Sequence, residues 1–130
     1  METLKKLTLE QVKKMQPCAK AFRQFINDFG TEAEIEELYE WLQERKDWLV
    51  WSMGAEINLS SSLLNLGAYV NTADLEGWTA LHWAAINNNA EIIKLLLNKQ
   101  ANKNITDNKG RKPIYWAIRY DYEKCIDLLA

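Results

Sequence analysis

Side chains that could carry out acid–base, nucleophilic or metal chemistry are few and scattered in this chain of 130 residues. The single histidine, His82, has no partner at the spacing that a metal site, a catalytic triad or a His–Cys pair needs. The three serines at 60–62 lack the flanking pattern of a nucleophile elbow, and no glycine-rich phosphate loop is present. We therefore expect no enzyme, no metal site and no bound cofactor.

The two cysteines also argue against metal or redox chemistry. Cys18 and Cys125 lie far apart, and Cys125 stands where helical spacing places a core residue. Reduced, buried thiols are therefore expected. No apolar run is long enough for a signal peptide or a membrane span, so we expect a cytoplasmic protein that does not contact a membrane.

The charge balance makes a nucleic-acid partner unlikely to bind directly. With 16 basic and 18 acidic side chains, the formal net charge is −2. A field of this sign does not attract phosphate groups over long range, although it leaves a local basic patch open.

A line of acidic side chains could act by electrostatic attraction. Glu32, Glu36, Glu40 and Glu44 recur at every fourth residue, which would align them on one face of a helix. Like charges at this spacing cost a few tenths of a kcal/mol per pair. One interpretation is a solvated face that lysines and arginines of the preceding helices neutralise. The other is a docking stripe for a basic partner, such as the nucleic-acid-binding groove of another protein.

The C-terminal half of the chain contains a segment that repeats at an offset of 33 residues. Gly77 recurs as Gly110, and its neighbours recur with it. The further pairs are Asn71 and Asn104, Asp74 and Asp107, Leu81 and Ile114, Trp83 and Trp116, Ala84 and Ala117, and Ile93 and Ile126. Self-similarity at this length is typical of stacked supersecondary units that bind other molecules.

The residues after each glycine resemble the ankyrin-repeat signature, in which Thr, Pro, Leu, His, any residue and Ala follow a glycine turn. Residues 77–85 match it except for Ala80, where the family has Pro. Residues 110–117 keep Pro113 but lack the Thr and the His. The resemblance covers about residues 58–130 and implies an all-α fold, a short ankyrin-repeat solenoid of two clear repeats plus a degenerate one.

Capping patterns predict helices in the N-terminal part as well. Thr8 and Gln11 have the spacing of a capping box. Thr31 and Glu34 have it too, which predicts a second helix running to about Arg45. All five glycines, at positions 30, 54, 67, 77 and 110, are expected at element boundaries.

The N-terminal helices are expected to cover the open end of the repeat array. They are loosely similar to an N-terminal helical module of bacterial and phage proteins of unknown function. We expect a capping module at 1–57 and ankyrin repeats at 58–130, packed as one continuous domain.

The resemblance also implies where a partner binds, since ankyrin arrays use their turn tips and the concave side of their first helices. By position, these residues are Leu75, Glu76, Trp78, Ile86 and Asn87 in one repeat, and Asn108, Lys109, Arg111, Arg119 and Tyr120 in the other. The resemblance also implies that the His82 ring bridges neighbouring turns. We expect Trp83 and Trp116 to pack against each other in the core.

The sequence therefore predicts a protein-binding scaffold. The first hypothesis is a small adaptor or inhibitor, of a bacterial or phage kind, that occludes a partner protein. The alternative is a structural accessory subunit of a bacterial or phage complex.

Overall fold

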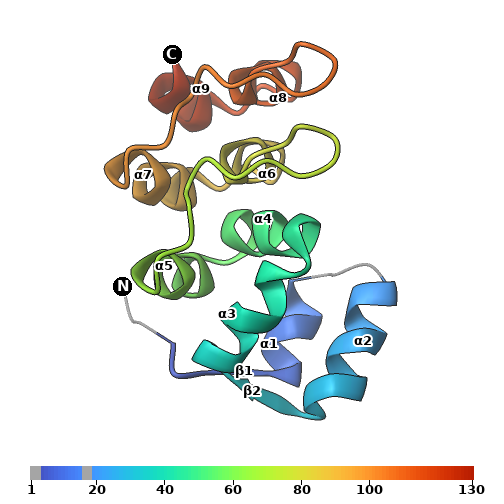
Figure 1. The fold of residues 1–130 in the computed structure, drawn as a ribbon. Helices are drawn as coiled ribbons and strands as arrows, with labels where there is room; N and C mark the ends of the chain where they lie inside the picture. The colour runs from blue at the N-terminus through green and yellow to red at the C-terminus, as the bar shows by residue number, and fades with distance from the viewer. Residues whose placement is uncertain (1–3, 16–18) are drawn as a thin grey trace.

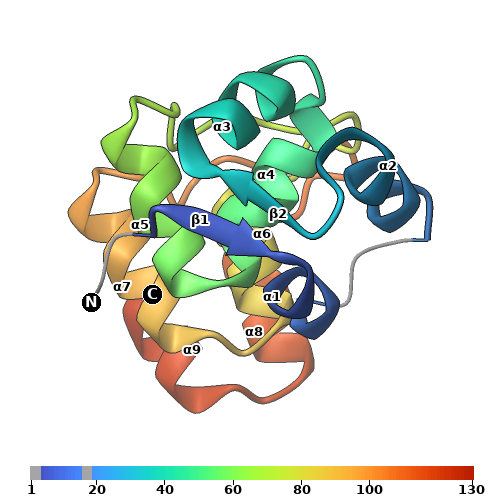
Figure 2. The same ribbon diagram turned by 90° about the horizontal axis from the view of Figure 1, so that it is seen from below.

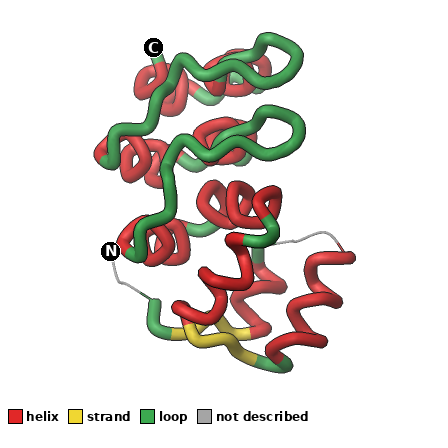
Figure 3. The backbone as a smooth tube through the Cα atoms, in the orientation of Figure 1, coloured by secondary structure: helices red, strands yellow, loops and turns green. Residues whose placement is uncertain are grey.

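Three helix pairs are stacked in a row, and the N-terminal elements pack against one end of it (Figures 1 and 3). The computed structural model describes residues 4–15 and 19–130, so Pro17 and Cys18 lie outside the described residues. The pairs are α4 (Lys46–Ala55) with α5 (Ile57–Asn65), α6 (Ala80–Ile86) with α7 (Ala90–Asn98), and α8 (Pro113–Arg119) with α9 (Glu123–Leu129). The helix-dominated solenoid expected from the 33-residue offset is confirmed.

An aspartate and a glycine build the turn before each of the last two pairs. Asp74 Oδ1 accepts hydrogen bonds from the backbone N–H groups two and four residues further on, both at 2.9 Å. Gly77 then takes a φ of 79°, which its missing Cβ permits. Asp107 and Gly110 build the second turn in the same way. Both turns therefore project on the same side of the stack (Figure 1).

The first helix pair includes residues before the expected start of the degenerate unit at about residue 58. Helix α4 begins at Lys46 and packs against both α5 and α6. The serines at 60–62 lie inside α5, where all three are buried. Ser62 Oγ donates to the Asn58 carbonyl at 2.8 Å and accepts from the Leu4 N–H at 2.7 Å, so the buried hydroxyl of Ser62 also holds the N-terminal segment.

Gly54 lies one residue before the end of α4, and close packing adds a second reason for a glycine here. A Cβ at this position would stand 2.5 Å from Trp83 Cβ and 2.8 Å from the Ala80 carbonyl oxygen of α6. Both atoms are fixed by the backbone, so neither can move aside cheaply. Glycine at this position therefore permits the close approach of α4 and α6.

The N-terminal part contains a short strand pair that the sequence did not indicate. Strand β1 (Lys6–Thr8) pairs antiparallel with β2 (Glu32–Glu34), with Leu7 opposite Ala33. Helices α1 (Leu9–Lys14) and α2 (Ala19–Phe29) follow β1, and α3 (Ile35–Gln43) follows β2. The capping box predicted for Thr31 and Glu34 is therefore wrong, because strand pairing holds the backbone that the box would have capped. The box at Thr8 and Gln11 is confirmed.

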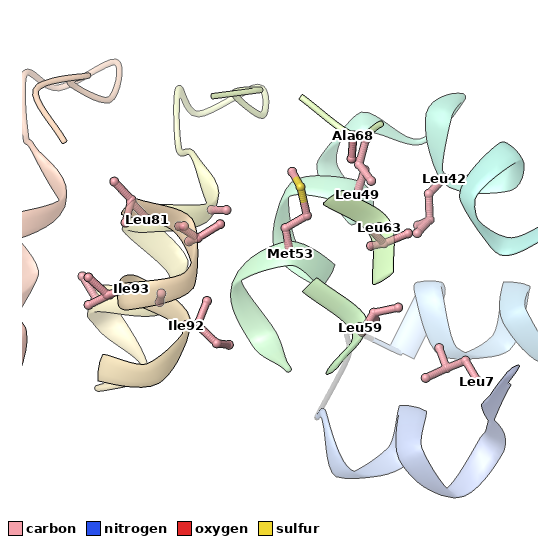
Figure 4. Packing of buried hydrophobic residues seen from close by; sticks show 14 of the residues in the cluster. Leu7, Leu42, Leu49, Met53, Leu59, Leu63, Ala68, Leu81, Ile92 and Ile93 are labelled. Carbon is pink, nitrogen blue, oxygen red and sulfur yellow. The ribbon is translucent and has the colours of Figure 1, made fainter. Parts of the chain in front are cut away.

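One hydrophobic core runs through the N-terminal part and the stack. Leu7 of β1 and Leu42 of α3 belong to the same cluster as Leu59, Leu63 and, further along, Ile93 (Figure 4). Seen along the stack, β1, β2 and α1 to α3 lie across its end (Figure 2). This arrangement fits the expected capping module, although its boundary at 57 stays a prediction. Among the described residues, no helix is long and apolar enough to cross a membrane.

The close contact at Gly54 gives a test of the helix packing. We expect Gly54→Ala to lower the free energy of unfolding by about 1–3 kcal/mol, because the added methyl group overlaps backbone-fixed atoms of α6. Urea unfolding followed by circular dichroism measures this change. Lys94→Ala, at an exposed position of α7, is the control and should change stability by less than about 0.5 kcal/mol. A stabilised Gly54→Ala protein would show that α4 and α6 are further apart.

Candidate protein-binding surface

His82 joins consecutive repeats and is fully buried. Its Nδ1 accepts a hydrogen bond from the Thr79 N–H at 3.1 Å. A backbone N–H can only donate, so Nε2 carries the proton, which it donates to the Arg111 carbonyl oxygen at 2.9 Å. Burial lowers the pKa of His82 below its usual 6.5, and this outweighs the opposing hydrogen bond to Arg111. The imidazole is therefore neutral and bridges two turns, as the sequence implied.

The tips of neighbouring turns are joined by backbone hydrogen bonds. Asn108 donates its N–H to the Glu76 carbonyl at 3.0 Å and its side-chain amide to the Leu75 carbonyl at 2.8 Å. The Leu75 N–H in turn donates to Asp47 Oδ1 of α4, also at 3.0 Å. The predicted tip residues of both repeats are thus brought together on one rigid edge. The Leu75 side chain itself remains 83% exposed.

A row of aromatic rings crosses the two repeats. Trp78 lies between Trp83 and Trp116, with ring centroids 4.8 Å and 5.1 Å away. Trp116 continues to Tyr120 at 6.5 Å, and Tyr120 to Tyr122 at 5.8 Å. We call these five residues the aromatic row.

The aromatic row corrects the expected packing of two tryptophans. Trp83 and Trp116 do not stack on each other in the core, because the half-buried Trp78 ring separates them. The core positions beside them belong to small residues instead, since Ala84 and Ala117 are fully buried. Trp78 therefore supports the fold as well as the surface.

Arg111 is already engaged within the chain. Its Nε donates to Asp107 Oδ2 at 2.8 Å, and its guanidinium lies 4.5 Å from the Trp116 ring centroid. Burial of Asp107 alone would raise its pKa, but hydrogen bonds from the backbone and side chain of Arg111 hold that pKa below 3.8. Arg111, which we expected to bind a partner, therefore already uses part of its guanidinium for contacts within the chain.

Two exposed apolar side chains near the row were missed from the sequence. Ile118 is 59% exposed and Tyr115 is 40% exposed. At the 33-residue offset they correspond to Ala85 and His82, which are fully buried by the following repeat. Comparing repeats position by position could have identified them.

The remaining predicted positions lie on the same two repeats. Asn87 follows α6 directly, and Arg119 and Tyr120 occupy the corresponding end of α8. Asn87, Lys109 and Arg119 are exposed, Ile86 is half-buried, and Tyr120 is 48% exposed. Their role in binding stays a prediction.

The acidic stripe is broken in the structure. Glu32 lies in β2, where its carboxylate pairs with Lys6 at 3.1 Å, so it is not on the helix of the others. Glu36 and Glu40 are exposed on α3, and Glu44 caps the C-terminus of that helix. The expected four-residue line is therefore wrong, because strand pairing removes its first member.

The geometry of the repeats agrees with the comparison of the sequence with known families. The family model described as ankyrin repeats (3 copies) matches residues 49–130. This chain belongs to the ankyrin-repeat family. The matched range includes most of α4, so the first helix pair is counted among the three copies.

Relatives of this ankyrin-repeat chain share short stretches with it. It is 54% identical over 44 residues to Ankyrin repeat and SOCS box protein 3 of Bos taurus, which covers 34% of this chain and 8% of that protein. It is 43% identical over 51 residues to human Inversin, covering 39% and 5%. It is 33% identical over 82 residues to Protein glp-1 of Caenorhabditis elegans, covering 63% and 6%. The chain thus spans less than a tenth of the length of these relatives.

Ankyrin repeats are a protein–protein interaction scaffold. No group of three or more His, Cys, Asp or Glu side chains that could hold a metal ion occurs within residues 4–15 and 19–130. The Cys125 thiol is buried against Asn88 Oδ1 at 3.5 Å, and burial raises its pKa. Cys125 is therefore a buried free thiol, whereas the same expectation for Cys18 lies outside the described residues.

The buried imidazole makes the stability of the ankyrin-repeat array depend on pH. Because the pKa of His82 is lower in the folded than in the unfolded chain, the unfolded chain binds more protons below 6.5. We expect the free energy of unfolding to fall as the pH drops from about 7.5 to about 5.5. Urea titrations at both pH values measure it. The control, His82→Gln, should lose most of this dependence, and an equal dependence in the variant would contradict the assignment.

The members of the aromatic row differ in burial, so we expect them to differ in their contribution to stability. We expect Trp78→Ala to lower the free energy of unfolding by about 2–4 kcal/mol, because it removes the ring between two others. Tyr120→Ala should cost less than about 1 kcal/mol, because the ring is nearly half exposed. Thermal unfolding of both variants tests this order. Equal melting temperatures would mean that Trp78 does not hold the repeats together.

Proposed function

We propose that the chain binds another protein through the aromatic row and the turn tips beside it. The observation that carries this proposal is a continuous set of contacting aromatic rings, partly open to solvent, that spans both clear repeats. Large aromatic side chains supply much apolar contact area at a low cost in side-chain entropy. Ile118 and Tyr115 widen the apolar surface beside α8.

The support of this surface favours a rigid mode of binding. Trp78 is fixed between two rings, and His82 ties the turn of one repeat to the next. A surface that is ordered before binding loses less conformational entropy when the partner arrives. Complementarity of shape therefore supplies the specificity of the complex.

We infer that the complex acts by occlusion, with the chain as a small adaptor or inhibitor in the cytoplasm. The alternative is an accessory subunit that holds a complex together. A bacterial or phage source was expected from the N-terminal module, whereas the relatives reported above are eukaryotic. The proposal therefore rests on the repeat surface alone. It assigns no catalytic step to any residue.

The broken acidic stripe leaves a smaller alternative surface. Glu36 and Glu40 lie on consecutive turns of α3 and are exposed. A basic partner attracted by these charges would bind more weakly as salt screens them. This dependence separates the stripe from the aromatic row, whose contacts are largely apolar.

Proteins retained on the immobilised chain from an extract of its native host supply the partner for the test. We expect Tyr120→Ala to weaken binding of the purified partner by about 2 kcal/mol, roughly thirtyfold, with little change in melting temperature. Glu36→Lys with Glu40→Lys is the comparison, and its affinity should match that of the unchanged protein at two salt concentrations. Titration calorimetry measures both.

The opposite pattern would overturn the proposed surface. If the Glu36→Lys, Glu40→Lys variant loses affinity and salt dependence while Tyr120→Ala retains both, the stripe binds the partner. The activity of the partner then separates the two roles. An inhibitor lowers that activity on binding, whereas removal of an accessory subunit disrupts assembly.

A further inference from the structure

The chain twice holds one of its own arginines between a tryptophan ring and a carboxylate. The Arg45 guanidinium lies 4.3 Å from the Trp41 ring centroid and 3.9 Å from Asp28 Oδ2. Arg111 lies over Trp116 and pairs with Asp107, as described above. A planar guanidinium stacks on a ring while its edge donates to a carboxylate, so this combination recognises arginine.

A third set of tryptophans and carboxylates lines a groove where the N-terminal module meets the first turn. The groove has a volume of about 530 Å³. Its walls include Trp51 of α4, Trp83 of α6, and Asp47, Asp74, Leu75 and Glu76 around the turn tip. Tryptophan rings and carboxylates therefore line the groove, and no basic side chain is among its described lining residues.

Comparison of the two repeats at the 33-residue offset shows that the first repeat lacks the arginine that pairs with the aspartate of the second. Asp74 corresponds to Asp107 and Trp83 to Trp116, but Trp78 stands where the second repeat has Arg111. Asp74 Oδ2 accepts only a 3.3 Å hydrogen bond from the Trp83 indole, whereas Asp107 Oδ2 accepts one of 2.8 Å from Arg111. The carboxylate of the first repeat is therefore not neutralised by an ion pair among the described residues.

The other carboxylates also leave room for a donor. Asp47 Oδ1 accepts from the Leu75 N–H, and within the described chain no hydrogen bond or ion pair engages the Glu76 carboxylate. Trp48 also lines the groove, and the Arg45 guanidinium lies 5.9 Å from its ring centroid. Arg45 also donates to the Trp41 carbonyl at 2.9 Å, so its guanidinium is committed outside the groove.

We propose that this groove binds an arginine side chain of a partner protein. The guanidinium stacks on the rings of Trp51 or Trp83 and donates to the carboxylates of Asp47, Asp74 and Glu76. An adjoining groove of about 370 Å³ shares Asp47, Trp48, Asp74 and Leu75 with it and gives space for the residues that flank the arginine. Arg45 and Lys46 line that adjoining groove, so the positive charge lies beside the arginine site and not in it. This binding site shares Trp83 with the aromatic row and Leu75 and Glu76 with the turn tips, but it lies on the side of them that faces the N-terminal module and does not involve Tyr120.

The geometry favours arginine over lysine. Both internal examples combine a flat ring with a carboxylate at its edge, an arrangement that a planar guanidinium fills with stacking and directed donors together. An ammonium group is a strongly hydrated point charge and gains less from the rings. We therefore expect the site to distinguish the two cations.

A short peptide tests the site without any knowledge of the partner. The probe is acetyl-Ala-Arg-Ala-amide, titrated into the full chain, and the readout is the set of tryptophan indole signals in two-dimensional ¹H–¹⁵N NMR. We expect saturable shifts of the Trp51 and Trp83 indole signals. Citrulline is the neutral isostere of arginine. The citrulline peptide and the lysine peptide should each bind at least about tenfold more weakly than the arginine peptide.

Matched variants locate the binding. Asp47→Asn with Glu76→Gln removes charge from the groove and should weaken the arginine peptide by about tenfold. Glu36→Gln with Glu40→Gln removes the same charge from α3 and should leave the affinity unchanged.

Several outcomes would overturn the proposal. These are equal binding of the citrulline or lysine peptide, shifts confined to Trp78 and Trp116, equal loss in both pairs of variants, or no shift at millimolar peptide. If the arginine peptide does not bind the groove, a partner whose binding requires Tyr120 can still bind the aromatic row. The two proposals can therefore fail separately.

Discussion

The close approach of the first helices of successive pairs is the constraint on which the rest of the structure depends. Gly54 leaves no room for a Cβ against α6, and the fully buried Ala84 and Ala117 continue the row of small residues. A large side chain at these positions would separate the helices and open the core. The bulky residues next to them, Trp83 and Trp116, therefore lie half-buried at the edge of the stack. Packing inside the stack thus creates the aromatic row outside it.

Stability and surface are coupled through the same residues. The His82 bridge holds two turns at a fixed spacing, and that spacing lets Trp78 fill the gap between the tryptophans of adjacent repeats. A surface built in this way is ordered before any partner binds. Only its outer members, such as Tyr120 and Ile118, can be changed without also disturbing the array.

The sequence predicted what is determined locally or by the repeat itself. The turns at Gly77 and Gly110 follow from side-chain hydrogen bonds within four residues, and their recurrence revealed the stacking. The pairing of β1 with β2 joins two segments that lie 26 residues apart in the sequence. Each segment is only three residues long, which is too short for an alternating pattern of apolar residues to predict a strand. The position of Trp78 between two rings is a tertiary result, since neither propensity nor spacing fixes the orientation of an indole ring. For the same reason the tip residues could be named from the sequence, but the partners of Arg111 and Asp107 could not.

Capping of the array and the proposed arginine groove arise from one packing event. The apolar end of a repeat stack must be covered, and the N-terminal module covers it through contacts of α3 with α4 and α5. The same placement brings α2 and α4 beside the turn at Leu75, so Ala21 and Trp51 form walls of a groove whose rim carries Asp74 and Glu76. A further ankyrin repeat at this end would bring its own turn against Leu75, as the turn at Asn108 does on the other side. The groove therefore exists because the cap is not itself a repeat, and the carboxylates of Asp47 and Glu76 remain exposed where a neighbouring turn would have covered them.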